Sequence, residues 1–394
     1  MNKYFKLNDI CDISGGYAFK STSFRECGIP IIRIGDISDN KINISETTAY
    51  INENIEKYKK FIISKGDILI ALSGATTGKF GIYDYDEPAL LNQRVAKLFP
   101  KKDVLNKYLY HYMNKLQDII YNKALGCAQP NISPREIGEL EIYLPNISEQ
   151  KKIVEILDKA QILIYKRKEQ IKYLDELVKS KFIEMFGDPI TNPKNIEQVY
   201  LKDLSKLITK GASPNWQGIE YVDDETQTLF VTSENVREGY IDLSKKKFLM
   251  DAFNEKQKRS VLQSGDFLIN IVGASIGRAA QFNLDIKANI NQAVALVRLK
   301  DGVINDKYLL TYLNSPKALK MYESMQVSVA RANLSLQNIN DLEILLPPIE
   351  LQNQFADFVK QVDKLKFEME KSLKELEDNF NSLMQKAFKG ELFN

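Results

Sequence analysis

Two short runs of cations occupy equivalent places in the two halves of this 394-residue chain. Ammonium and guanidinium groups repeated at one structural position suit phosphate oxygens, and such contacts give a nucleic-acid-binding protein affinity without reading sequence. The alternative is a solvated charged turn, and the repetition is the observation that favours phosphate contact. The candidates are Lys57, Lys59 and Lys60 in the first half and Lys256, Lys258 and Arg259 in the second.

A second set of polar and aromatic residues lies on predicted loops and differs between the two halves. Such side chains can address base edges, and they should differ if each half reads different bases. Each could instead be a turn residue that bonds backbone groups, and the large aromatics could simply pack. The base-reading candidates are Gly16, Tyr17, Thr76, Thr77, Lys79, Gln129, Ser213, Asn215, Trp216, Ser275, Arg278 and Arg331.

One dipeptide is the same in both halves, Asn92-Gln93 and Asn291-Gln292. Since residues that read different bases should diverge, the identity favours a structural hydrogen-bonding role for these two pairs.

No catalytic constellation is recognisable. Residues 74–80 resemble a phosphate-binding loop, but three residues instead of four separate the glycines, and Phe80 stands where Ser or Thr would hold magnesium. No GxGxxG, GxSxG or HExxH motif is present. His111 is the single histidine, and Cys11, Cys27 and Cys127 have no CxxC spacing, so we predict neither a metal site nor a disulfide framework. A recognition module is favoured over an enzyme.

The candidates are positioned by a tandem duplication. Lys65–Ile70 recurs as Ser264–Ile269, and the two Asn-Gln pairs follow at the same offset (265 − 66 and 291 − 92 both give 199). Further along the offset becomes 202, as Gln150 matches Gln352, which a small loop insertion explains.

Each half has the same predicted plan. Runs rich in β-branched residues, such as Ile29–Ile34, Ile68–Leu72 and Val294–Leu299, predict short strands separated by turns. A short helix is predicted near Lys107–Tyr121 and another near Lys307–Met325, each followed by a Leu-Pro step.

A long helix without internal proline or glycine then closes each half. Apolar residues in both helices follow a heptad pattern, which predicts that they pack against each other, antiparallel, around an approximate twofold axis. Two unrelated surface helices are the alternative. Gly187 and Gly390 stand where the helices should stop. The seam positions are Ile153, Leu157, Ala160, Ile164, Ile171, Leu174 and Val178, then Phe355, Val359, Val362, Met369, Leu373, Leu376 and Phe380, interrupted by Arg167 and Lys366.

The fold class predicted is α/β (α+β), with two β-rich domains separated by two long antiparallel coiled-coil helices. The predicted divisions are residues 1–147, 148–187, 188–348 and 349–394. No stretch has the length and apolarity of a membrane span or a signal peptide, so a cytoplasmic location is expected. The net charge of only +2 means that any nucleic-acid surface needs locally concentrated cations.

These motifs resemble the specificity subunits of type I restriction–modification systems. The resemblance rests on Gly-Asp-Ile-Leu-Ile, Gly-x-x-x-Gly and Asn-Gln in that order, then Leu-Pro-x-Ile-x-x-Gln opening a long helix. It covers nearly the whole chain and occurs twice. Leu346–Gln352 is the closer match, whereas the first half has Asn146 where the second has Pro348.

The resemblance implies that residues 1–147 and 188–348 are target recognition domains and that the helices are spacers. It implies an asymmetric bipartite site on double-stranded DNA, two modification subunits that methylate adenine, and two restriction subunits. S-adenosylmethionine, ATP and Mg would be bound by those partners, with no cofactor and no catalysis in this chain. The alternatives are the specificity partner of another methyltransferase–nuclease system and a coiled-coil scaffold that does not bind DNA.

Overall fold

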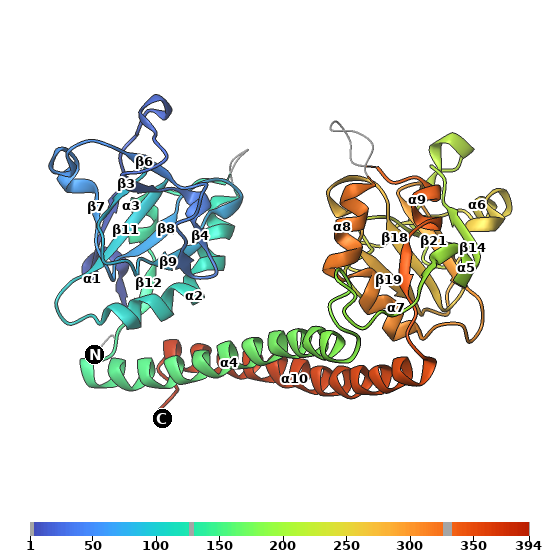
Figure 1. The fold of residues 1–394 in the computed structure, drawn as a ribbon. Coiled ribbons are helices and arrows are strands. Elements are labelled where there is room, and N and C mark those ends of the chain that lie inside the picture. Colours follow the sequence, from blue (N-terminus) through green and yellow to red (C-terminus); the bar gives the residue numbers. More distant parts are fainter. Residues whose placement is uncertain (1–3, 126–129, 326–332, 394) are drawn as a thin grey trace. The chain divides into compact units, whose positions relative to one another are not determined.

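The computed structural model describes residues 4–125, 130–325 and 333–393, which form two compact units (Figure 1). The first unit contains residues 1–168 and 371–394, and the second contains residues 169–370. Each unit therefore combines one β-rich domain with part of each long helix, α4 (Ile147–Phe186) and α10 (Ile349–Lys389). The division into two domains and two separate helical segments stays a prediction, because each compact unit contains parts of both helical segments.

The first unit is built on three sheets. The largest has the order β2 (Cys11–Gly15), β11 (Val95–Pro100), β8 (Ile68–Ala71), β9 (Phe80–Ile82), β5 (Lys41–Ile42) and β4 (Ile37–Ser38). The next has the order β6 (Ala49–Ile51), β3 (Ile29–Ile32), β10 (Ala89–Leu91) and β7 (Ile62–Ile63). The last pairs β1 (Tyr4–Lys6) with β12 (Glu141–Tyr143).

The second unit also has three sheets, and its counterpart of the six-stranded sheet has four strands. Its sheets have the orders β14 (Ser205–Lys210), β21 (Val294–Leu299), β18 (Asp266–Asn270), β19 (Ala279–Phe282), and β15 (Tyr221–Val222), β17 (Phe248–Leu249), β16 (Thr228–Val231), β20 (Ala288–Ile290). The third pairs β13 (Gln198–Tyr200) with β22 (Glu343–Leu345). The register is kept as well, since Val95 pairs with Ala71 and Val294 with Asn270, each 199 residues apart between the copies.

The repeated Gly-Asp pair makes the turn that starts the central strands β8 and β18. Gly66 and Gly265 have φ values of +92° and +97°, which favour glycine because it lacks a Cβ. The carboxylates of Asp67 and Asp266 accept hydrogen bonds from the backbone N–H three residues earlier, at 2.8 and 2.7 Å. The motif is therefore a turn device in both halves.

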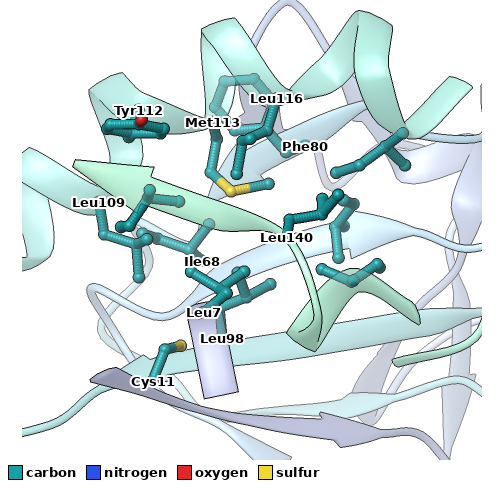
Figure 2. Close-up of a cluster of buried hydrophobic side chains, with 14 of the residues drawn as sticks. Leu7, Cys11, Ile68, Phe80, Leu98, Leu109, Tyr112, Met113, Leu116 and Leu140 are labelled. Atoms are coloured by element: carbon teal, nitrogen blue, oxygen red, sulfur yellow. The ribbon is translucent and has the colours of Figure 1, made fainter. Parts of the chain in front are cut away.

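Helix α2 (Asn106–Ala124) confirms the predicted helix and covers the first sheet. Figure 2 shows Met113 and Leu116 of α2 lying among the same buried side chains as Ile68 and Leu98 of the sheet.

The helical segment predicted near Lys307–Met325 is present but is divided into two helices. The structure has α7 (Asp306–Leu313) followed by α8 (Pro316–Ser324). Pro316 occupies the first turn of α8, and the Ser315 side chain caps it by accepting a hydrogen bond from Ala318 N–H, so a new helix starts here.

Two more pairs of short helices correspond between the copies. In the first pair, Ser133 and Ser335 each form a capping box, at the start of α3 (Pro134–Gly138) and α9 (Leu336–Asn340). The second pair is α1 (Leu7–Ile10) with α5 (Leu201–Leu204), whereas α6 (Ala252–Lys256) has a 3-10 helix, Ile55–Phe61, as its counterpart.

The long helices confirm the predicted antiparallel pairing within each unit. In the first unit Lys168 of α4 contacts Glu377 of α10 at 2.8 Å, and in the second Asp175 contacts Lys366 at 2.6 Å. All the predicted seam positions are buried or half-buried. Both helices end before a glycine of positive φ, Gly187 and Gly390, as predicted.

A buried glutamine joins the start of each long helix to the domain that precedes it in the sequence. Gln150 accepts a hydrogen bond from Leu105 N–H at 2.9 Å and donates to Pro145 O at 2.9 Å. Gln352 makes the matching bonds with Asn305 N–H at 2.8 Å and Pro347 O at 2.7 Å. These bonds explain why glutamine recurs at both helix starts.

Each helix also ends in the core of the unit at its far end. Phe388 of α10 is fully buried in the first unit, with its ring 4.4 Å from that of Tyr112. Phe186 of α4, also fully buried, lies 4.8 Å from Tyr308 in the second unit. The two phenylalanines are separated by the same 202 residues as the two glutamines. The core of each unit is thus completed by the helix that began in the other.

No helix among the described residues has the length and apolarity needed to cross a membrane.

We expect Phe388→Ala to destabilise the first unit by about 3–5 kcal/mol and to leave the second unit unchanged, because a buried ring is removed from one core. Phe186→Ala should do the reverse. Hydrogen exchange resolved by peptide measures both units separately in the full chain. Phe367→Ala is the matched control, since Phe367 is on the same helix and exposed. A uniform loss of protection in both units after either core substitution would contradict the assignment.

Candidate nucleic-acid interface

Loops from four parts of the first unit meet at one end of the β8–β11 pair. Leu72 N–H donates to Arg94 O, and Ile132 N–H donates to Leu72 O, both at 2.9 Å. Gln93 N–H donates to Tyr17 O at 2.9 Å. These bonds place three loops and Tyr17 side by side, so most candidates in the first half that the structure describes share one edge of the domain.

The second unit builds the same loop edge. Ile271 N–H donates to Ala293 O at 2.9 Å, and Leu334 N–H donates to Ile271 O at 2.8 Å. The two domains therefore present different side chains on a common backbone frame.

The cationic segment of the first unit is a 3-10 helix, Ile55–Phe61, held by a buried tyrosine. The ring of Tyr58 packs against Phe19 and Tyr17 at 5.1 and 5.2 Å, which brings the lysines next to the loop edge. Lys59 and Lys60 are exposed and make no ion pair with any residue that the structure describes.

Lys57 differs from its two neighbours. Its ammonium lies 2.7 Å from the Glu53 carboxylate, and this hydrogen bond raises the pKa of Lys57 and lowers the pKa of Glu53. Part of its charge is therefore already compensated within the protein, and Lys59 and Lys60 are the stronger candidates for phosphate.

The cationic segment of the second unit spans α6 and a 3-10 turn, Lys258–Ser260. Phe253 anchors it in the core, and Lys256 donates to Gln217 O at 2.5 Å, which ties the segment to the loop that carries Asn215 and Trp216. Lys258 lies 3.5 Å from Glu255, whereas Arg259 is exposed and has no ion pair among the described residues. Both units thus join a cationic segment to an aromatic loop.

The two aromatic candidates are placed differently. Tyr17 is 41% exposed, and its ring contacts Phe19, Tyr58 and Phe61, so packing accounts for much of its surface. Trp216 is 83% exposed on a 3-10 turn. An indole that is left so open is available to stack or pack on a ligand.

The candidates in the β8–β9 turn and its counterpart are of two kinds, exposed side chains and residues that stabilise the turn. Lys79 and its counterpart Arg278 are exposed, and neither has an ion pair among the residues placed in the structure. Thr77 is only 3% exposed, and its hydroxyl donates to Gly74 O at 2.7 Å. Thr77 therefore acts as a turn residue. The hydroxyl oxygen of Thr76 is buried as well.

Three further candidates are found near these loops. A Cβ on Gly16 would lie 2.2 Å from Asn92 O, so glycine there permits a close backbone approach. Ser275 accepts a hydrogen bond from Asn270 at 3.1 Å, and Ser213 lies beside the Trp216 turn in sequence. Gln129 and Arg331 lie outside the described residues.

The repeated Asn-Gln pair divides into two roles. Asn92 and Asn291 each accept a hydrogen bond from the backbone N–H two residues later, as expected for structural residues. Gln93 and Gln292 are exposed at the loop edge. The identity of the pair in both copies suggested a structural role for both residues. The structure gives that role to the asparagines, and it leaves the glutamines on the surface, where they can contact a base edge or a phosphate.

The described residues contain no group of three or more His, Cys, Asp and Glu side chains placed to hold a metal ion. His111 is fully buried and lies 2.7 Å from Asp158, and burial lowers its pKa. It therefore links α2 to α4 within the first unit.

Comparison with known proteins points to one family. A family model described as type I restriction modification DNA specificity domain matches residues 2–173 and 193–378. The type I restriction enzyme EcoBI specificity subunit of Escherichia coli is 25% identical over 98% of this chain and 85% of its own length. The EcoKI specificity subunit of Escherichia coli strain K12 is 23% identical over 92% of this chain and 82% of its own.

Solved structures show the same fold. The type I restriction–modification S subunit from M. genitalium superposes with a TM-score of 0.50 at 16% identity, covering 98% of this chain and 95% of that one. A chain from a study of complex assembly and conformational transition in the type I R-M system gives 0.59 at 17% identity, covering 99% and 98%.

We expect Lys59→Glu and Lys60→Glu each to weaken binding to duplex DNA by a similar factor for every sequence. Removing one lysine–phosphate interaction should lower the slope of log affinity against log salt by about 0.9. Lys102→Glu is the control, because exposed Lys102 follows the opposite end of β11. A salt titration of duplex binding checks both, and affinities equal to that of the wild type would exclude the phosphate role.

Proposed function

Because this chain belongs to the type I restriction modification DNA specificity family, we propose that it recognises an asymmetric, bipartite DNA sequence, one part with each unit. The observation that carries the proposal is one loop edge built twice on the same frame with different side chains. The β8–β11 and β18–β21 pairs have the same register. At the repeat offset of 199, however, Lys79 aligns with Arg278 and Tyr17 aligns with Trp216.

The proposal divides recognition between two kinds of contact. The cationic segments neutralise phosphates and set the position of each domain on the duplex. Exposed loop side chains that differ between the copies, such as Lys79 and Trp216, then address bases.

The proposal also assigns partners. Two modification subunits, which bind S-adenosylmethionine and methylate adenine, dock on this chain, and two restriction subunits, which use ATP and Mg, join them. The repeat supports this, because two copies of one frame offer two similar surfaces to two identical partners. In this scheme the chain supplies recognition and no catalytic group.

We expect cells that contain this chain and its neighbouring methyltransferase to carry methylated adenine in a bipartite motif. Modification-sensitive long-read sequencing of their DNA gives the motif directly. The motif should vanish when this chain is removed and change in one half only when one domain is exchanged. A methyltransferase that is active and bound but leaves no motif would refute the proposal.

The helices α4 and α10 are proposed to set the length of the gap of unspecified sequence between the two parts of the DNA site. One heptad inserted into both helices, after Lys168 and after Glu370, keeps the apolar seam and lengthens each helix by about 10 Å. The methylated motif should then have a gap about three base pairs longer, at about 3.4 Å per base pair. Insertion of half a heptad breaks the seam and should abolish methylation. An unchanged gap after the full insertion would contradict the spacer role.

A further inference from the structure

A polar cavity of about 330 Å³ lies in the second unit, between the hairpin of residues 233–245 and the β18–β19 turn. Its lining is rich in hydrogen-bond donors, and its hydroxyl groups come from Ser233, Ser244 and Ser275. Three cations, Arg237, Lys245 and Arg278, also line it. Arginine, lysine and serine together form the donor set that proteins use for phosphate oxygens.

The cavity has an excess of positive charge. Its two carboxylates both have cationic partners, since Asp242 lies 3.5 Å from Arg237 and Glu234 lies 3.2 Å from Lys247. Lys245 and Arg278 are exposed and have no ion pair in the part of the chain that the structure describes. Two uncompensated cations therefore face one concave site, which attracts an anion.

Two buried asparagines hold the walls of the cavity together. The Asn270 amide donates to Ser233 O at 3.0 Å on one wall and to Ser275 Oγ at 3.1 Å on the other. The Asn235 amide donates to Asp242 O at 2.9 Å and to Lys245 O at 3.1 Å. The donors are thus positioned before any ligand arrives, which limits the conformational entropy lost on binding.

The first unit has the same hairpin without these side chains. Asn43 N–H donates to Asp36 O at 2.8 Å, as Asp242 N–H donates to Asn235 O at 2.7 Å. At the offset of 199, however, Ser38 replaces Arg237, Glu46 replaces Lys245 and Ala71 replaces Asn270. The backbone is shared, but among the described residues the first unit keeps only Lys79, at the position of Arg278, of the three cations that line the cavity.

We propose that this cavity binds a phosphate group of the DNA backbone and that the second unit thereby anchors the duplex more strongly than the first. The proposal rests on the DNA-recognition function proposed above and deepens it. Base edges lie inside a groove, where side chains that protrude from the protein reach them, whereas a concave cationic site encloses a phosphate that projects from the duplex. Binding here should therefore be independent of sequence and sensitive to salt.

The test measures duplex binding by the full chain over a range of salt concentrations, with Lys245→Gln and Arg278→Gln. Two duplexes are used, one carrying the methylated motif and one with the same composition in scrambled order. Each substitution should lower the salt slope by about 0.9 and weaken binding to both duplexes by the same factor, roughly threefold to tenfold. Thermal unfolding confirms that the variants are folded.

Lys246→Gln is the matched control, because Lys246 lies next to Lys245, pairs with Glu225 at 3.1 Å and does not line the cavity. Its slope should equal that of the wild type. In the first unit, Glu46→Lys adds the missing charge to an exposed position, and it should raise both the affinity and the slope for the two duplexes.

Three results would overturn the proposal: unchanged binding by both cavity variants, a decrease equal to that of Lys246→Gln, or a decrease confined to the motif duplex, which would make the cavity a base-reading site. A wild-type chain that binds no duplex at low salt would instead refute the DNA-binding function itself, so the two failures can be told apart.

Discussion

The burial of one phenylalanine from each long helix is the contact on which the rest of the structure depends. Phe388 enters the core of the first unit beside Tyr112, although it lies near the end of the chain, and Phe186 enters the core of the second unit beside Tyr308. The core of each β-rich domain is completed by the end of a long helix, α10 in the first unit and α4 in the second. Non-local closure of this kind costs loop entropy before any contact forms, and burial of large rings offsets that cost.

This closure explains why the frame is kept while the loops vary. The residues that fasten the helices are the same type in both halves, namely Gln150 with Gln352 and Phe186 with Phe388. Their side chains are buried, so a change there leaves an unpaired backbone group or a void. The loop edge lies on the surface and tolerates exchange, as Lys79 and Arg278 show. The core residues are therefore shared by the two units, while the loop side chains differ between them.

Much of the fold was predictable because the sequence repeats and because its apolar residues recur at regular spacing. Two copies of one pattern identified the domains, and the heptad seam identified the paired helices. The break before Pro316 was missed, although a serine followed by proline is a recognised helix start. The packing of Phe186 and Phe388 could not be predicted, since both lie beyond the last assigned seam position. The cavity could not be predicted because Arg237 and Arg278 come from segments far apart in the sequence, which the buried amide of Asn270 helps to join.

The small net charge of +2 becomes intelligible when the cations are sorted by their partners. On the helices, lysines such as Lys168 and Lys366 are compensated by carboxylates a few ångströms away. Cations without an ion pair among the described residues are found at the loop edges and cavity, where Lys59, Arg259 and Arg278 are exposed, and also along the helices. Non-specific affinity for DNA rises with the number of phosphates neutralised. Because the net charge is small, attraction to DNA depends on where the unpaired cations are concentrated, and discrimination between sequences comes from the loop side chains that differ between the two halves.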